Sequence, residues 1–208
     1  LYSSAASDVY KRQVALLTRE IPSDVIRGNP HFPDPQKRLI AATVNGIRIV
    51  CAYIPNGQAV GSEKYDYKLA WLDELEAWLG ELLQENPLLA LAGDFNIAPD
   101  DRDVHNPEAW AGQILCSEPE RTAFRRLLAL GLKDSFRLFE QPEKAFSWWD
   151  YRMLGFQKNH GLRIDHILLS DPLASRCAAA GIDREMRKRE RPSDHAPVTA
   201  DISDISHG

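Results

Sequence analysis

The chain has little cysteine: three residues among 208, an odd number, widely spaced and without a CxxC pair. Disulfide frameworks and zinc sites need paired or clustered cysteines, so the pattern indicates reduced thiols and a cytoplasmic protein. The sequence also lacks an apolar run of membrane-spanning length, and nothing near its start resembles a secretory signal. We therefore expect a soluble protein without a membrane partner.

An excess of positive charge is absent too, with 25 Lys and Arg residues against 30 Asp and Glu residues. The resulting net charge of −5 argues against a protein that holds nucleic acid mainly by bulk charge. One local basic run, residues 184–191, is compatible with a solvated loop and with a track for phosphates. Hydrophobic content of 44% is typical of a globular domain, and the length allows one domain with a sizeable core.

The first thirteen residues differ in character from the rest. Residues 8–13 back-translate without strain into the transposon end that is used to build sequencing libraries. We therefore predict that residues 1–13 are a non-native artefact, with an ordinary N-terminal tail as the alternative. Residues 14–208 are predicted to form one domain that lacks its N-terminal part.

Strand patterns dominate the chain, and helical patterns lie between them. Asn45-Gly46 between two β-rich runs is a strong hairpin signal, because both central residues of a type I′ turn need positive φ. Helical spacing of apolar residues predicts one helix over residues 64–85, and a capping box opens another at Ser117. We expect strands over residues 14–18, 38–44, 47–53, 87–92, 146–151, 162–170 and 196–202, and helices over 64–85, 117–131 and 172–180. This order, with mostly antiparallel connections, favours a β-sandwich flanked by helices.

Two short acidic motifs stand next to predicted strands. Gly93-Asp94-Phe95-Asn96 follows the strand 87–92, at the end where sheet-based enzymes place their chemistry. Ser193-Asp194-His195 precedes the last strand, and Asp165 lies inside the strand 162–170. Buried carboxylates are unfavourable without partners or a metal, and oxygen ligands of this kind suit Mg²⁺. The motifs together predict phosphodiester hydrolysis.

Individual roles follow from the chemistry of each side chain. His195 could act as a base or as a charged clamp on phosphate, and Asp165 is the best candidate to fix its tautomer. Tyr53, at a strand end, could donate its phenol to a phosphate oxygen. Each residue also has a purely structural interpretation: Asp94 and Asn96 could form an Asx turn, and His195 could be a hydrogen-bonded core histidine.

Taken together, these motifs resemble the exodeoxyribonuclease III family of the endonuclease/exonuclease/phosphatase superfamily. The similarity extends over residues 14–202 and rests on the motifs at residues 53–57, 93–97, 146–152, 161–165 and 192–197. The resemblance implies an α+β fold, a four-layer α/β-sandwich of two packed mixed β-sheets flanked by helices. The sandwich is of the deoxyribonuclease I type, and this chain is expected to lack its first strands.

The resemblance also implies an activity: a Mg²⁺-dependent enzyme, with Mn²⁺ as an alternative ion, that repairs DNA. Its expected partner is double-stranded DNA with abasic sites or blocked 3′ ends, and it is expected to act as a monomer. The implied catalytic residues are Tyr53, Asp94, Asn96, Asp165 and His195; the metal site is Asp94, Asn96, Asp194 and His195; the substrate contacts are Trp148, Arg152, Leu162 and Ile164. Either Asp94 or His195 could be the general base.

One family feature has no match in this sequence. Family members begin with a strand that carries an Asn, followed by a Gln-Glu motif whose Glu is the principal metal ligand. Glu20 falls after that region and cannot replace it. We therefore expect two inner strands to be absent, and the chain by itself to be an incomplete enzyme. A phosphoesterase for lipid headgroups or phosphoinositides and a catalytically silent DNA-binding remnant are the alternatives.

Overall fold

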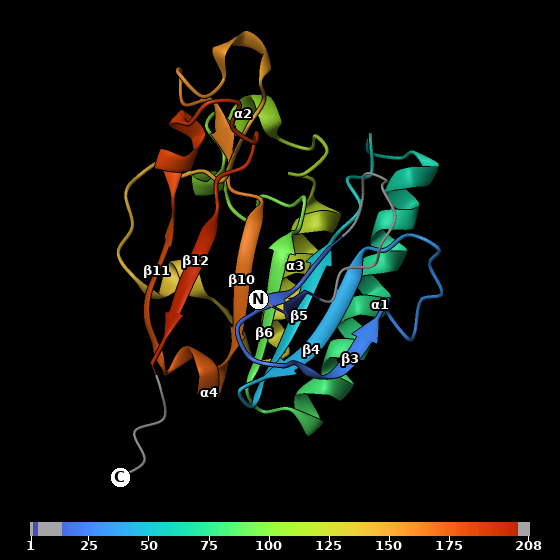
Figure 1. Ribbon diagram of the computed structural model, residues 1–208. Coiled ribbons are helices and arrows are strands. Elements are labelled where there is room, and N and C mark those ends of the chain that lie inside the picture. The colour runs from blue at the N-terminus through green and yellow to red at the C-terminus, as the bar shows by residue number, and fades with distance from the viewer. Residues whose placement is uncertain (1, 4–13, 204–208) are drawn as a thin grey trace.

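A six-stranded mixed sheet is the largest element of the computed structural model, which describes residues 2–3 and 14–203 (Figure 1). In spatial order its strands are β3 (Ser23–Arg27), β4 (Leu39–Val44), β5 (Ile47–Tyr53), β6 (Leu89–Asp94), β10 (Asp165–Ser170) and β7 (Leu132–Asp134). Strands β5 and β6 run parallel, and the other neighbouring pairs are antiparallel. Most of the predicted artefact, residues 1–13, lies outside the described residues; residues 2–3 form β1 (Tyr2–Ser3), which pairs with β2 (Leu17–Thr18).

Two helices pack on this sheet and share one hydrophobic core with it. Helix α1 (Glu63–Glu85) connects β5 to β6, as a parallel pair requires, and buries Trp71, Leu75 and Leu79. Helix α3 (Glu118–Ala129) begins with the predicted capping box between Ser117 and Glu120 and adds Phe124 and Leu127 to the core. Both long helices were therefore predicted correctly, and the two tryptophans of α1 are buried.

A smaller sheet of β11 (Cys177–Ile182) and β12 (Val198–Ile202) lies alongside β10 (Figure 1). The fold is thus of the predicted α+β class, with packed sheets and flanking helices. The remaining short elements are η1 (Asp101–Asp103), α2 (Pro107–Trp110), η2 (Ser135–Leu138), β8 (Trp148–Trp149), η3 (Arg152–Leu154), β9 (Gly161–Leu162), α4 (Asp171–Ala174) and η4 (Arg184–Lys188). No helix among the described residues has the length and apolarity needed to cross a bilayer.

The predicted hairpin is present, but other local predictions were wrong. Asn45 and Gly46 have φ of 49° and 75°, as a type I′ turn requires. The predicted helix 172–180 ends at Ala174, because residues 177–182 pair with β12 and this pairing overrides local helix propensity. The prediction of mostly antiparallel connections is confirmed, and among the described strands β5 and β6 form the parallel pair.

The predicted strand 162–170 is broken in two, and the predicted strand 146–151 shrinks to β8. Leu162 pairs with Trp148, whereas Asp165 pairs with Asp94, so the chain changes its partner strand at residues 163–164. Arg163 fills the break, and its buried guanidinium makes ion pairs with Asp103 and Asp134. A strand pattern cannot show such a change of partner.

Gly93 provides a test of how closely β5 and β6 approach beside the acidic motif. Its φ is 142°, and a Cβ atom at this position would lie 2.0 Å from the carbonyl oxygen of Ala52. We expect Gly93→Ala to lower the free energy of unfolding by about 3 kcal/mol or more, or to prevent folding. Gly80→Ala in α1 is the matched control: its nearest neighbour would be Leu130 Cδ2 at 3.8 Å, and stability should rise by about 0.5–1 kcal/mol. Urea denaturation followed by circular dichroism checks both, and equal stability of Gly93→Ala and the unmodified protein would contradict the steric argument.

Candidate active site

Three of the predicted site residues form a row across the large sheet. The register pairs Tyr53 of β5 with Asp94 of β6, and Asp94 with Asp165 of β10. Directly paired residues on neighbouring strands project to the same face of a sheet. The phenol and the two carboxylates therefore lie side by side, although 112 positions separate the first from the last.

His195 joins this row from the segment before β12. Its Nδ1 lies 2.9 Å from Oδ2 and 3.0 Å from Oδ1 of Asp165, the partner that was predicted for it. Ser147 holds both partners: its carbonyl accepts from the Ala196 N–H at 2.7 Å, and its Oγ accepts from the Asp165 N–H at 3.0 Å. The Asp165 carboxylate thus orients the imidazole through Nδ1, and Ser147 fixes the backbone beside both residues.

The electrostatic environment sets His195 and Asp94 apart from ordinary surface groups. Burial lowers the pKa of His195, but the hydrogen bond and charge of Asp165, with Asp94 and Asp194, outweigh burial and raise it to about 9. Burial raises the pKa of Asp94, and the charge of Asp165 raises it further, to about 7. His195 therefore carries a proton at neutral pH, and Asp94 titrates near neutrality.

Asn96 orders the loop that follows β6. Its backbone N–H and side-chain amide donate to the two carboxylate oxygens of Asp94 at 2.9 and 3.2 Å, and the amide also donates to the Ile54 carbonyl at 3.0 Å. The N–H contact is the Asx turn of the structural interpretation, and Asn96 has a positive φ of 50°. This turn aims the Asp94 carboxylate, so the structural and functional interpretations of the motif are compatible.

Three side chains of the row fit a divalent metal ion. Ligand atoms of Asp94, Asp165 and His195 all lie within 4.8 Å of one another, and this is the one such group found among the described residues. Burial and the neighbouring charge of Asp165 both raise the pKa of Asp94, and a cation bound here would offset both effects. The acidic group is therefore a candidate metal site.

The other predicted site residues have different surroundings. Asp194 is outside this group; its Oδ2 accepts from Trp148 Nε1 at 3.0 Å. Leu162 and Ile164 are only 0% and 2% exposed and belong to a hydrophobic cluster on which the partly exposed Trp148 packs. Arg152 is exposed and paired with Asp150. Of the four predicted substrate contacts, Trp148 and Arg152 present surface in this structure.

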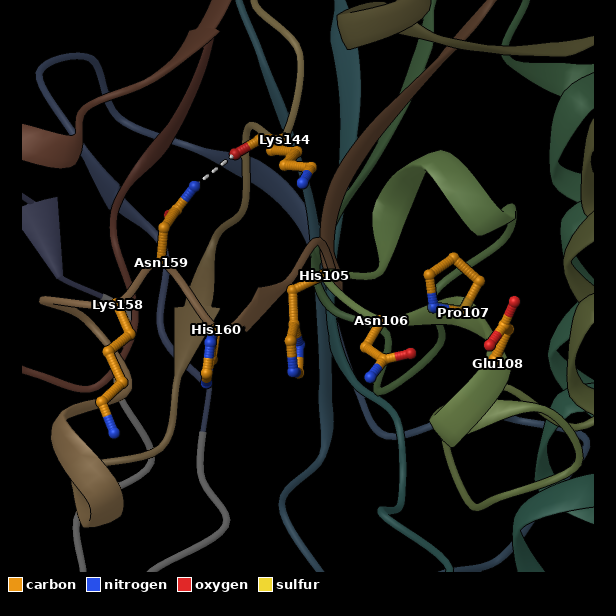
Figure 2. Close-up of a pocket in the computed structure, with 8 residues that line it drawn as sticks. All are labelled: His105, Asn106, Pro107, Glu108, Lys144, Lys158, Asn159 and His160. Carbon is orange, nitrogen blue, oxygen red and sulfur yellow. Dashed lines mark hydrogen bonds between the residues drawn. The ribbon is translucent and has the colours of Figure 1, made fainter.

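A pocket of about 570 Å³ contains none of the residues of the row (Figure 2). His105 and His160 stack there with ring centroids 4.8 Å apart and planes inclined by 12°. The His105 N–H donates to the Gly161 carbonyl at 3.1 Å, which ties this pocket to the β8–β9 hairpin. No sequence signal pointed to the stacked pair.

Lys68 was not identified from the sequence, and its side chain binds the loop that follows β6 from the interior of the protein. Lys68 is fully buried and donates to the Asn96 carbonyl at 2.7 Å. A signal was available, because Lys68 shares the buried stripe of α1 with residues 65, 71, 72, 75, 78, 79 and 82, and a cation on such a stripe needs a buried partner.

Comparison with known proteins agrees with this geometry. A model of the Endonuclease/Exonuclease/phosphatase family matches residues 5–195. Exodeoxyribonuclease III of Haemophilus influenzae is 41% identical over 203 residues, which cover 91% of this chain and 76% of the relative. The chain belongs to the exodeoxyribonuclease III family. An exodeoxyribonuclease of Bacillus subtilis shares 34% identity with this family member, over 88% of this chain and 71% of the relative.

Solved structures extend the exodeoxyribonuclease III likeness to three dimensions. A 3′ phosphatase from Neisseria, bound to a product DNA hairpin, has a TM-score of 0.95 at 43% identity and is matched over 97% of this chain and 79% of its own. An AP endonuclease from Archaeoglobus fulgidus has a TM-score of 0.85 at 35% identity, over 91% and 74% of the two chains. The predicted family and fold are confirmed.

The pairing of His195 with Asp165 makes a prediction for proton NMR in the absence of divalent ions. The imidazole of His195 should titrate near pH 9, and Asp165→Asn should move its midpoint down, because the charge that holds the proton is lost. The internal control is His166, whose pKa burial and the Arg163 charge lower to about 3, so it should not titrate between pH 5 and 10. An unchanged His195 midpoint in Asp165→Asn would contradict the assignment.

Proposed function

We propose that this chain carries the catalytic centre of a metal-dependent DNA-repair phosphodiesterase. It would cleave the DNA backbone at abasic sites and remove 3′ nucleotides or 3′ blocking groups. The observation that carries the proposal is the row Tyr53–Asp94–Asp165 with His195 beside it, in contact with the Asp165 carboxylate. The names of the relatives support it, since they include an exodeoxyribonuclease III, a 3′ phosphatase and an AP endonuclease.

The row supplies the groups that hydrolysis of a phosphodiester requires. Charge on the non-bridging oxygens has to be neutralised, and a water molecule has to lose a proton as it attacks. His195 with its pKa of about 9 keeps its proton, so we assign it the role of an electrostatic clamp on phosphate. The Tyr53 phenol can donate a hydrogen bond to the same phosphate group from the neighbouring strand.

Asp94 is the better candidate for the general base. A base works best when its pKa is near the working pH, and the pKa of Asp94 is raised to about 7. Asn96 donates hydrogen bonds to both oxygens of the Asp94 carboxylate and so fixes the orientation of this group. We therefore propose Asp94, rather than His195, as the general base.

Mg²⁺ is the ion that we propose for the site, with Mn²⁺ as an alternative, because both accept carboxylate and amide oxygens. The proposed ligands are the oxygens of Asp94, Asn96 and Asp194, of which Asp94 belongs to the group whose ligand atoms lie within 4.8 Å. His195, which the sequence also offered as a ligand, keeps its proton and is assigned to the phosphate instead. When bound, the ion would neutralise charge on the phosphate oxygens.

We propose that the surface beside Trp148 selects the damaged nucleotide. Trp148 packs on the buried Leu162 and Ile164, whose side chains would form the apolar floor below an extruded sugar. A nucleotide without a base has no stacking to lose, so its extrusion is easier than that of an intact nucleotide. Arg152 is exposed close by in sequence and could contact the DNA backbone.

We also propose a reducing, cytoplasmic setting for the protein, which the free cysteines Cys51, Cys116 and Cys177 support.

The test is cleavage, by the full-length protein, of a duplex that carries a tetrahydrofuran abasic analogue, with Mg²⁺ or with EDTA. Cleavage should need the ion, and Asp94→Asn or His195→Asn should lower kcat by about 100-fold or more with little change in the Kd for DNA. Asp101→Asn is the control, since Asp101 is an exposed carboxylate paired with Arg121. An intact abasic duplex, or hydrolysis of a phosphoinositide in its place, would overturn the proposal.

The pKa values predict a bell-shaped pH profile of kcat/KM. Activity should rise as Asp94 loses its proton, at or below pH 7 because a bound cation lowers its pKa, and fall near pH 9 as His195 loses its proton. His195→Asn should abolish the falling limb and leave the rising limb in place. Loss of the rising limb in that variant would instead assign the base to His195.

A further inference from the structure

Lys68 is a fully buried cation beneath the active site. Its Nζ donates to the Asn96 carbonyl at 2.7 Å, to the Asn56 carbonyl at 3.2 Å and to the carboxylate of Glu120, which is itself fully buried. The ammonium group has three N–H donors, and these three acceptors match them. Lys68 is therefore held at one position by three different segments of the chain.

Two of these segments are the loops that follow β5 and β6, directly after Tyr53 and Asp94 of the row. Asn56 follows Tyr53 at the end of β5, and Asn96 follows Asp94 at the end of β6. The side chains of the two asparagines also meet, since Asn56 Nδ2 donates to Asn96 Oδ1 at 3.0 Å. Because Asn96 donates to both carboxylate oxygens of Asp94, one residue connects Lys68 to the proposed base.

The loop after β5 is shaped around the Lys68 side chain. A Cβ atom at Gly57 would lie 3.1 Å from Lys68 Cδ, and the φ of Gly57 is 88°, a conformation that glycine adopts readily. Asn96 also has a positive φ, of 50°, which a non-glycine residue keeps only when its surroundings hold it there. The contacts of Lys68 supply such a constraint on both loops.

Glu120 anchors the cation from the other side. Its Oε1 accepts from the Leu115 N–H at 3.1 Å, and its Oε2 accepts from the Ser117 N–H at 3.1 Å and from Ser117 Oγ at 2.6 Å. The carboxylate is thus fixed to the start of α3. Burying both charges costs desolvation free energy, so such a pair contributes less to stability than to a defined geometry.

We propose that Lys68 is a positioning residue, which holds the two loops so that the Asp94 carboxylate and the Tyr53 phenol face the same phosphate. This role rests on the proposed function of the row. Lys68 does not touch the reacting atoms. Its loss should therefore lower kcat while KM for DNA stays nearly constant.

The test replaces both buried charges together. Lys68→Met alone would leave Glu120 buried without its cation and could prevent folding, whereas Lys68→Met/Glu120→Gln removes both charges and keeps a similar volume. We expect this double variant to fold and to lose about 10-fold or more in kcat on the abasic duplex, with KM changed less than about 3-fold. A folded double variant with the kcat of the unmodified protein would overturn the positioning role.

A matched control and a conservative variant sharpen the result. Arg126→Met removes the cation that bridges the same two helices through Glu76 and Asp73, at a place without contact to either loop, and should leave kcat unchanged. Lys68→Gln/Glu120→Gln keeps one N–H donor beneath the loops and should retain more kcat than the Met variant. Equal losses in all three variants would assign Lys68 to helix packing alone.

A readout without catalysis separates this proposal from the proposed function. The Asn96 side-chain amide should exchange slowly with solvent in the unmodified protein and in Arg126→Met, and faster in both Lys68 variants, as measured by NMR. Unchanged exchange in the folded Lys68→Gln/Glu120→Gln variant would overturn the positioning role, even where the Met variant fails to fold. Absence of cleavage by the unmodified protein, with the exchange difference present, would overturn the proposed function alone.

Discussion

The pairing of β6 with β5 on one side and β10 on the other is the interaction on which the site depends. It places Tyr53, Asp94 and Asp165 in one row, and a shift of the register by one residue would turn Asp94 to the opposite face. Gly93 allows the close approach, because a side chain there would collide with the Ala52 carbonyl. The chemistry of the site is therefore a consequence of hydrogen bonding between backbones.

Buried polar side chains fix the segments of the site that lie outside the strands. The chain leaves the sheet in loops directly after Tyr53 and Asp94, and loops lack a ladder of hydrogen bonds to define them. Lys68 binds the carbonyls after β5 and β6, Ser147 joins Asp165 to the segment of His195, and Arg163 occupies the break before β10. Each of these groups is satisfied by several partners, which makes the arrangement rigid where the proposed reaction needs fixed distances.

Local patterns predicted the parts of the fold that local forces decide. The Asn45-Gly46 turn, the buried stripe of α1 and the capping box at Ser117 depend on residues within one or two turns of the chain, and all three are present. Residues 172–180 were assigned to a helix because their composition favours one, but pairing with β12 draws 177–182 into a strand. The break at Arg163 escaped prediction because its ion-pair partners lie 60 and 29 positions away.

The sequence by itself determined the chemical types present and the family: acidic and amide groups after a buried strand, an Asp-His motif before another, and aromatic motifs typical of exodeoxyribonuclease III proteins. Residue order carries this information because strand ends and motif spacing are local. The tertiary structure alone decided that Asp94, Asp165 and His195 come within 4.8 Å and that Lys68 lies beneath them. It also decided that burial and the Asp165 charge raise the pKa of Asp94, and that contact with Asp165 raises the pKa of His195. Distances between distant segments and the burial that shifts a pKa exist only once the sheet has formed and water has left the core.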